Sequence, residues 1–338
     1  MISNDDFEKA VELINKSSNV LMTTHTRPDG DACGCIVAMS DALSALGKKV
    51  KPLWLSDIPE WYNFLFAEKV PILGKDIQHE ELIEGQFGDF DLIIIVDTNS
   101  ASQLPKFDQY LKQADKPVLI IDHHATADGL GNVELVDSNA AATALIIFDL
   151  LKYAKWSVTE KIAEALFVAI ATDTGWFQFR NTDSRVYRAC AELIDAGAKP
   201  IEIHESLYQD FSHQRFKLMV TMLNTLELHL DDRFAIQHIS QRDFEQTGAT
   251  HKDTESLINE CQRISTVEAA ALFVELKDGR FRCSLRSTGS VDVSTIAARF
   301  GGGGHKMAAA TYLPGPLENA KKLILAEMTE IFKSLSRK

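Results

Sequence analysis

Three short apolar runs in this chain each end in His or Asp, and this pattern restricts the fold more than any other feature. Short runs rich in Val, Leu and Ile are typical of buried parallel strands, and open α/β sheets bind ligands beyond the carboxyl ends of their strands. We therefore expect the polar residues to meet at one edge of a parallel sheet. The runs and the residues that follow them are Val20–Thr24 with His25, Leu92–Val96 with Asp97, and Pro117–Ile121 with Asp122, His123 and His124.

Three more aspartates are candidates for the same group. Asp29 and Asp31 follow His25 in the tight loop His-Thr-Arg-Pro-Asp-Gly-Asp, and Asp173 closes a helical segment made of Ala, Leu, Phe, Val and Ile. Burying so many carboxylates together is costly unless cations neutralise them. Each acid alone is also compatible with an ordinary turn or helix cap. The joint pattern predicts a site for more than one metal ion.

The residue types indicate which metals and which chemistry to expect. Mixed imidazole and carboxylate ligands suit Mn²⁺, Fe²⁺, Co²⁺ or Zn²⁺ better than Mg²⁺. Two such ions about 3.5–4 Å apart, bridged by a carboxylate and a water, are a general device for attacking phosphorus. We expect Asp97 to be the bridge, because its strand should lie between the other two ligand-bearing strands. Asp122 is expected to orient an imidazole.

The composition limits the classes of function. The 338 residues suffice for two domains of ordinary size, and the formal net charge of −13 leaves no broad basic surface for long duplex nucleic acid. The five cysteines are scattered and odd in number, which favours a reducing cytoplasm over a disulfide framework. The apolar stretches are too short to span a bilayer, and the polar, acidic start is unlike a signal peptide.

The order of these patterns predicts two α/β domains. Residues 1–195 alternate strands with helices, which favours a mostly parallel sheet flanked by helices. Residues 196–229 are expected to form a helical connector, and residues 230–338 a smaller α/β domain with a mixed sheet. The main expected helices are 4–16, 32–46, 141–153, 159–172, 293–300 and one from 317; the expected strands are 18–24, 49–55, 91–96, 117–121, 234–239, 270–276, 281–287 and 308–313.

A glycine run in the second domain predicts a grip on substrate. The four consecutive glycines from Gly301 let a backbone approach a ligand closely and donate amides to an anion. Arginine at the end of a nearby predicted strand is suited to bidentate phosphate contact. The alternative is a flexible turn beside surface charge. The residues expected to clamp a terminal phosphate and base are Arg286, Gly302, Gly303, Gly304 and His305.

In these motifs the chain resembles the DHH phosphoesterase superfamily, named for the triplet present here as Asp122-His123-His124. The resemblance extends to a C-terminal signature, Gly301–His305 followed by Ala308-Ala309-Ala310, and covers nearly the whole chain. It implies manganese as the usual metal, with Mg²⁺ or Co²⁺ as substitutes, and His124 as the contact to the scissile phosphate or the attacking water. The implied ligands are His25, Asp29 and Asp97 for one ion, and Asp31, Asp97, His123 and Asp173 for the other.

Within the superfamily, the domain order and length look most like the subgroup of bifunctional oligoribonucleases and 3′-phosphoadenosine 5′-phosphate (pAp) phosphatases. This implies a cytoplasmic enzyme that hydrolyses very short RNA to 5′-mononucleotides and removes the 3′-phosphate of pAp. The family's precedent also suggests a homodimer. The expected catalytic residues are Asp97, Asp122 and His124. The alternatives are a linear or cyclic dinucleotide phosphodiesterase, an inorganic pyrophosphatase or polyphosphatase, and a metal-binding regulatory module without turnover.

Overall fold

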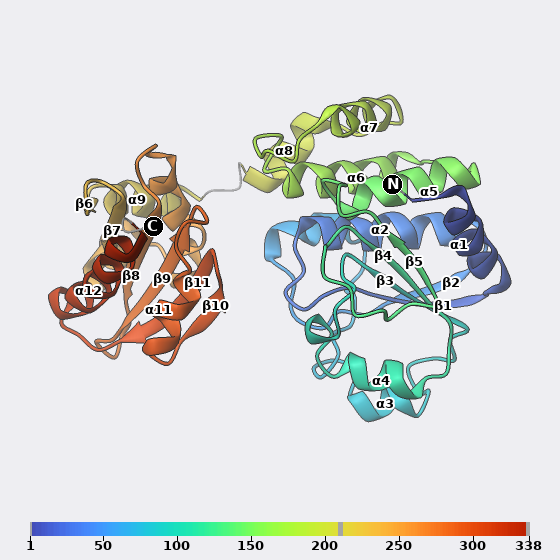
Figure 1. Ribbon diagram of the computed structural model, residues 1–338, viewed down its shortest axis with the longest axis horizontal. Coiled ribbons are helices and arrows are strands. Elements are labelled where there is room, and N and C mark those ends of the chain that lie inside the picture. The colour runs from blue at the N-terminus through green and yellow to red at the C-terminus, as the bar shows by residue number, and fades with distance from the viewer. Residues whose placement is uncertain (1, 209–211, 336–338) are drawn as a thin grey trace. The chain divides into compact units, whose positions relative to one another are not determined.

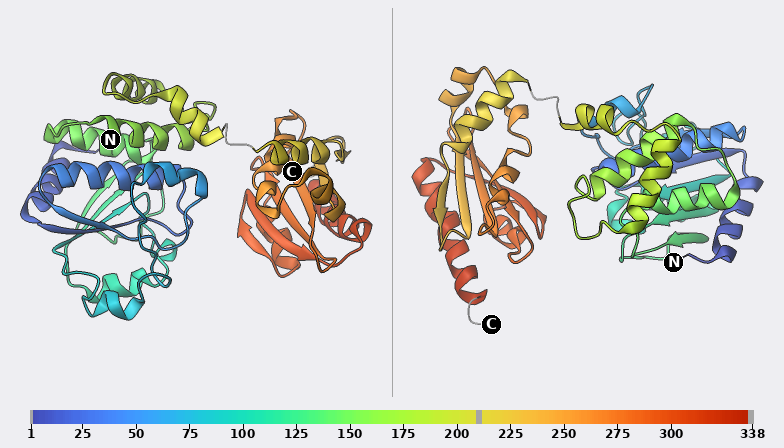
Figure 2. Two further views of the ribbon diagram at one scale, coloured as in Figure 1. Left: turned by 180° about the vertical axis from the view of Figure 1, so that it is seen from behind. Right: turned by 90° about the horizontal axis from the view of Figure 1, so that it is seen from above.

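The computed structural model describes residues 2–208 and 212–335. The chain forms two compact units, Met1–Asp210 and Phe211–Lys338. Figures 1 and 2 show that each unit contains its own sheet covered by helices. The predicted α/β fold, with a parallel sheet first and a smaller mixed-sheet part second, is confirmed.

The first unit contains a five-stranded, fully parallel sheet in the order β2-β1-β3-β4-β5. Its strands are β1 (Asn19–Thr23), β2 (Lys49–Pro52), β3 (Leu92–Val96), β4 (Val118–Asp122) and β5 (Val133–Val136). All residues of β3 and β4 are buried, as expected for parallel strands covered on both faces. β3 lies between β1 and β4, as predicted. The sequence does not predict the edge strand β5, because only Leu135 in it is buried.

Helices cover both faces of this sheet. In the described part of this unit they are α1 (Asn4–Lys16), α2 (Gly30–Ala45), α3 (His79–Ile83), α4 (Phe107–Gln113), α5 (Thr143–Ala154), α6 (Glu160–Asp173), α7 (Ser184–Asp195) and α8 (Pro200–Tyr208), with 3₁₀ turns η1 (Glu60–Leu65) and η2 (Ala101–Gln103). Leu92 and Ile94 of β3 pack with α1, α2, α5 and α6, whereas Ile93 and Ile95 pack with α3 and α4. Figure 1 shows these two helical layers on opposite sides of the sheet.

The second unit contains a six-stranded mixed sheet in the order β10-β11-β9-β8-β7-β6. Only β7 and β8 are parallel neighbours. Its strands are β6 (Glu227–His229), β7 (Phe234–Ile239), β8 (Ala269–Glu275), β9 (Phe281–Ser287), β10 (Gly303–His305) and β11 (Ala308–Leu313). Its described helices are α9 (His213–Leu223), α10 (Gln241–Thr247), α11 (Val293–Arg299) and α12 (Leu317–Leu335), with 3₁₀ turns η3 (His251–Thr254) and η4 (Leu257–Arg263). The residues of α11 and α12 pack on one face of the sheet, and those of α9, α10 and η4 pack on the other.

The structure differs from the sequence analysis at three places. The range 196–229 is divided between the units, because Leu218 and Met222 of α9 are buried in the second unit's core. α2 begins at Gly30 rather than Ala32, since the Asp29 side chain caps it by accepting the Ala32 N–H. The glycine run ends in the edge strand β10 rather than in an open turn.

A separate finding concerns membranes. Among the described helices, none combines the length and the apolar character needed to cross a bilayer.

Candidate metal centre and catalytic site

The ends of β1, β3 and β4 bring His25, Asp97 and His123 together at one edge of the parallel sheet. Asp97 directly follows β3, and its backbone N–H donates to the Ile121 carbonyl over 2.8 Å. Its φ of +62° lies in the left-handed region and turns the chain out of the sheet. Because β3 is the middle strand of the three, the Asp97 carboxylate reaches the histidines on both sides.

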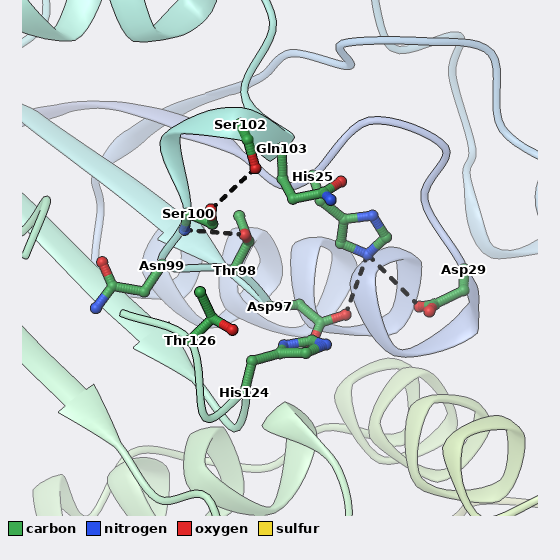
Figure 3. A pocket seen from close by; sticks show the side chains of 10 residues that line it. All are labelled: His25, Asp29, Asp97, Thr98, Asn99, Ser100, Ser102, Gln103, His124 and Thr126. Atoms are coloured by element: carbon green, nitrogen blue, oxygen red, sulfur yellow. Dashed lines mark hydrogen bonds and ion pairs between the residues drawn. The ribbon is translucent and has the colours of Figure 1, made fainter. Parts of the chain in front are cut away.

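The first group of candidate ligands consists of His25, Asp29 and Asp97. The His25 Nε2 atom lies 3.4 Å from Asp97 Oδ2 and 3.9 Å from Asp29 Oδ1, as Figure 3 shows. The other ring nitrogen, Nδ1, lies 2.9 Å from the Thr26 carbonyl oxygen. A proton on Nδ1 therefore donates to this carbonyl and leaves the Nε2 lone pair for a cation. One potential ligand atom from each residue lies within 4.8 Å of the others.

The second group consists of Asp31, His123 and Asp173, with Asp97 beside it. The His123 Nε2 atom lies 3.5 Å from Asp173 Oδ2, 3.6 Å from Asp97 Oδ1 and 3.9 Å from Asp31 Oδ2. Its Nδ1 lies 3.1 Å from the Ala140 carbonyl oxygen, which favours the same tautomer as in His25. Asp97 therefore presents Oδ2 to the first group and Oδ1 to the second.

Close packing of α2 against α6 sets the distance between Asp31 and Asp173. A Cβ atom on Gly30 would lie 2.2 Å from Thr172 Oγ1, and one on Gly34 would lie 2.3 Å from the Ala165 carbonyl oxygen. Glycine at both positions lets the two helices approach this closely. The carboxylate at the start of α2 and the one at the end of α6 can then contact the same imidazole.

The start of α5 holds two of these carboxylates, which the sequence does not predict. The Thr143 N–H donates to Asp31 Oδ2 over 2.6 Å, and the Thr143 hydroxyl donates to Asp97 Oδ1 over 2.9 Å. The Ala144 N–H donates to Asp31 Oδ1 over 3.1 Å. The first N–H groups of a helix have no intrahelical partner and favour anions. The only sequence signal for this contact is one hydroxyl after three alanines, at positions 140–143.

The aspartates of both groups are buried close to one another. Burial raises the pKa of Asp31 and of Asp97 well above the usual aspartate range, and neighbouring carboxylates raise both further. Burial also raises the pKa of Asp173 to about 7. Ionised carboxylates in such a cluster require positive charge to offset their desolvation and mutual repulsion. The imidazole and carboxylate donors, arranged in two groups around Asp97, fit two divalent cations.

Asp122 and His124 form a hydrogen-bonded pair next to these groups. His124 Nδ1 lies 2.7 Å from Asp122 Oδ1, and this hydrogen bond raises the pKa of His124 to about 9. Asp122 is completely buried, whereas 52% of the His124 side chain is exposed. His124 lines a pocket beside the first group. This geometry fits the orienting role predicted for Asp122.

Two family models match this chain. Residues 19–170 match the DHH family, N-terminal domain, and residues 231–334 match the DHHA1 domain. The bifunctional oligoribonuclease and PAP phosphatase NrnA of Thermus thermophilus is 30% identical over 312 residues, which are 92% of this chain and 89% of that protein. The chain belongs to the DHH phosphoesterase family. It is therefore an enzyme that hydrolyses phosphate esters.

Two further proteins resemble the chain along most of its length. The bifunctional oligoribonuclease and PAP phosphatase NrnA of Bacillus subtilis is 28% identical over 306 residues, covering 88% of this chain and 90% of that protein. The crystal structure of an exopolyphosphatase-related protein from Bacteroides fragilis matches with a TM-score of 0.83 at 21% identity, covering 99% of both chains. This second likeness concerns the fold alone.

The residues predicted to grip substrate lie in the DHHA1 unit, around one edge of its sheet. β11 pairs with both β10 and β9, so that Ala308 lies opposite His305 on one side and opposite Arg286 on the other. The side chain of His305 lies outside the described part of the chain. The half-buried Arg286 donates to the Leu285 carbonyl over 3.0 Å and has no carboxylate partner among the described residues.

The fold itself requires two of the predicted glycines. A Cβ atom on Gly302 would lie 2.2 Å from the Ala310 carbonyl oxygen, and one on Gly304 would lie 2.5 Å from the Ala308 carbonyl oxygen. A Cβ atom on Gly303 would meet no atom within 4 Å. Packing therefore explains Gly302 and Gly304, whereas Gly303 leaves room for a bound group.

Proposed function

We propose that this DHH enzyme is a divalent-metal-dependent phosphoesterase that hydrolyses very short oligoribonucleotides to 5′-mononucleotides and removes the 3′-phosphate of pAp. The observation that carries the proposal is the position of Asp97, whose Oδ2 lies 3.4 Å from His25 Nε2 and whose Oδ1 lies 3.6 Å from His123 Nε2. A carboxylate shared in this way suits two neighbouring cations. The names of the relatives from Thermus thermophilus and Bacillus subtilis support the substrate class.

Two cations would share the residues of this site. When bound, they would activate a water molecule at neutral pH and neutralise charge on the phosphoryl oxygens. Two imidazoles among carboxylates favour Mn²⁺, with Co²⁺ as a close substitute and Mg²⁺ as a weaker one. The proposed ligands are His25, Asp29 and Asp97 for one ion, and Asp31, Asp97, His123 and Asp173 for the other.

The protein's own groups prepare the site for phosphate. The hydrogen bonds from Thr143 hold Asp31 and Asp97 in place before a substrate arrives. His124, with a pKa of about 9, carries a proton at neutral pH. Because Nδ1–H donates to Asp122, the remaining Nε2–H is available to an oxygen of the scissile phosphate. His124 would therefore contact the reacting group, and Asp122 would orient it.

The DHHA1 unit would bind the rest of the substrate. Arg286 offers a bidentate donor without a carboxylate partner among the described residues, and Gly303 leaves its backbone open to a phosphate. The Gly302 N–H already donates to the Ala297 carbonyl over 2.9 Å, so the backbone of Gly304 and the nearby His305 would complete this grip. The ligands that we propose are short single-stranded RNA and pAp. The enzyme would act in the cytoplasm, where its five free cysteines would stay reduced.

A substrate panel with Mn²⁺ tests this function. The panel contains pAp, linear RNAs from dinucleotides to decanucleotides, cyclic dinucleotides and pyrophosphate. We expect the highest kcat/KM for pAp and the shortest RNAs, and a loss of about a thousandfold in Asp97→Ala, since several kcal/mol of transition-state stabilisation depend on the ions. Asp57→Ala, on an exposed carboxylate that pairs with Lys75, is the control. Preference for cyclic dinucleotides or pyrophosphate would contradict the proposal.

A further inference from the structure

A pocket of about 330 Å³ opens beside the candidate metal centre, within the first unit. Residues of the metal centre, including His25, Asp97 and His124, form one side, and the segment 98–103 together with Thr126 forms the other. Figure 3 shows these two sides. Small-molecule sites commonly enclose about 300–1,000 Å³, so this pocket suits a group about as large as one nucleoside.

The side of the pocket away from the metal centre is polar but carries no formal charge. Among the described residues that line the pocket, there is no Lys or Arg. A second phosphate placed there would lose its hydration without gaining a cationic partner. The hydroxyls of a sugar and the edge of a base are neutral, and neutral donors and acceptors satisfy them. The residues of this side are Thr98, Asn99, Ser100, Ser102, Gln103 and Thr126.

Some side chains on this side of the pocket already form hydrogen bonds within the protein. The Asn99 side-chain amide donates to Glu134 Oε2 over 2.9 Å. The Ser100 hydroxyl donates to Asp128 Oδ2 over 3.1 Å and lies 3.1 Å from the Ser102 hydroxyl. These contacts join the segment after β3 to Asp128, which precedes β5, and to Glu134 within β5. The Asn99 and Ser100 side chains therefore support the wall of the pocket and are not free to donate to a ligand.

Gln103 and Thr126 are differently placed. The Gln103 carbonyl accepts the Thr26 N–H over 2.9 Å, which fixes the residue beside the loop that carries His25. The side-chain amide of Gln103 has no hydrogen-bond partner among the described residues, and both Gln103 and His25 line the pocket drawn in Figure 3. The Thr126 hydroxyl, two residues beyond His124, also has no partner in the described chain. One amide and one hydroxyl are therefore available to a ligand.

We propose that Gln103 and Thr126 form a nucleoside-binding subsite that hydrogen-bonds the nucleoside attached to the phosphate being hydrolysed. This rests on the proposed function and deepens it, because it commits the site to nucleotides and against inorganic polyphosphates. Gln103 and Thr126 act as specificity-determining residues. The reacting atoms belong to the neighbouring metal centre.

The test compares a substrate that contains nucleosides with one that has none. It measures kcat and KM with Mn²⁺ for the dinucleotide pApA and for bis(p-nitrophenyl) phosphate. Gln103→Met keeps the side-chain length and removes the amide, and Thr126→Val removes the hydroxyl. Losing one neutral hydrogen bond lowers kcat/KM by about threefold to tenfold. We expect the ratio of kcat/KM for pApA to that for bis(p-nitrophenyl) phosphate to fall by this factor in each variant, mainly through KM.

Controls separate this subsite from a general effect on the fold. Gln109→Met, at an exposed position of α4 outside the pocket, keeps the wild-type ratio. Gln103→Lys adds a cation to the pocket and should raise kcat/KM for pyrophosphate relative to pApA. Thermal melting of each variant monitors folding.

Two results would overturn the subsite. One is an unchanged substrate ratio in both Gln103→Met and Thr126→Val, and the other is an equal loss on both substrates. The proposed function fails separately, if the wild-type enzyme cleaves pyrophosphate but neither pApA nor pAp.

Discussion

Without metal at alkaline pH, the Asp173→Asn variant should melt at a higher temperature than the wild type. In excess Mn²⁺ the wild type should melt at the higher temperature. The Asp173 side chain is only 25% exposed, and burial together with the Asp29 carboxylate raises its pKa from 3.8 to about 7. Because the folded pKa exceeds the unfolded one, ionisation of Asp173 opposes folding. This penalty is absent below about pH 4, grows as the pH rises to about 7, and stays constant above that.

The size of the effect follows from this pKa. A difference of about three pH units corresponds to about 4 kcal/mol of unfolding free energy, at roughly 1.4 kcal/mol per unit. Solvent screening and the imperfect fit of an amide reduce the expected gain to about 1–2 kcal/mol. In a domain of this size, each kcal/mol raises the melting temperature by about 2–4 °C.

The assay is thermal unfolding followed by circular dichroism, with a chelator and with Mn²⁺. With the chelator, Asp173→Asn should melt above the wild type near pH 8, and the gap should close as the pH falls toward 4. A ligand at about a hundred times its Kd stabilises the folded wild type by about 2.7 kcal/mol, and the variant should gain less. Asp57→Asn, at a side chain that is 73% exposed, should show no such dependence on metal. A variant that melts below the wild type without metal near pH 8, or a gap independent of pH, would refute this reasoning.

Three further predictions concern residues around the ligands and in the DHHA1 unit. Thr143→Val should weaken Mn²⁺ binding by about tenfold to a hundredfold in calorimetry, since it removes the hydroxyl that holds Asp97; Thr143→Ser should keep most of the affinity, and equal losses in both variants would argue against this role. Asp122→Asn should lower the pKa of His124 from about 9 in NMR titrations of the metal-free protein, whereas an unchanged titration would exclude the hydrogen bond as its cause. Gly303→Ala should melt at the wild-type temperature but hydrolyse dinucleotides more slowly, and full activity of this variant would count against a substrate contact at Gly303. Gly302→Ala should lower the melting temperature, because its Cβ atom would lie 2.2 Å from a carbonyl oxygen.

Much of the candidate site could be predicted from the sequence because of one property of parallel sheets. Apolar runs of strand length identify β3 and β4, and all parallel strands end at the same edge, so the residues that follow them must be close. The position of Asp97 between the two histidines could be predicted by assuming only that its strand lies between the other two. The six candidate ligands are therefore evident from local patterns, although the role of each as a ligand stays a prediction.

The contacts that complete the site depend on tertiary structure. Thr143 reaches Asp31 across 112 residues of sequence, and no local pattern encodes that distance. The free amide of Gln103 becomes significant only once a pocket forms around it. The edge strands β5 and β10 escape prediction because partly exposed strands lack the continuous apolar run of a buried one. The local sequence patterns are enough to identify the candidate metal ligands, because the ends of parallel strands converge at one edge of the sheet. The groups that hold and surround these ligands follow from the folded chain alone, because those contacts arise from packing between distant segments.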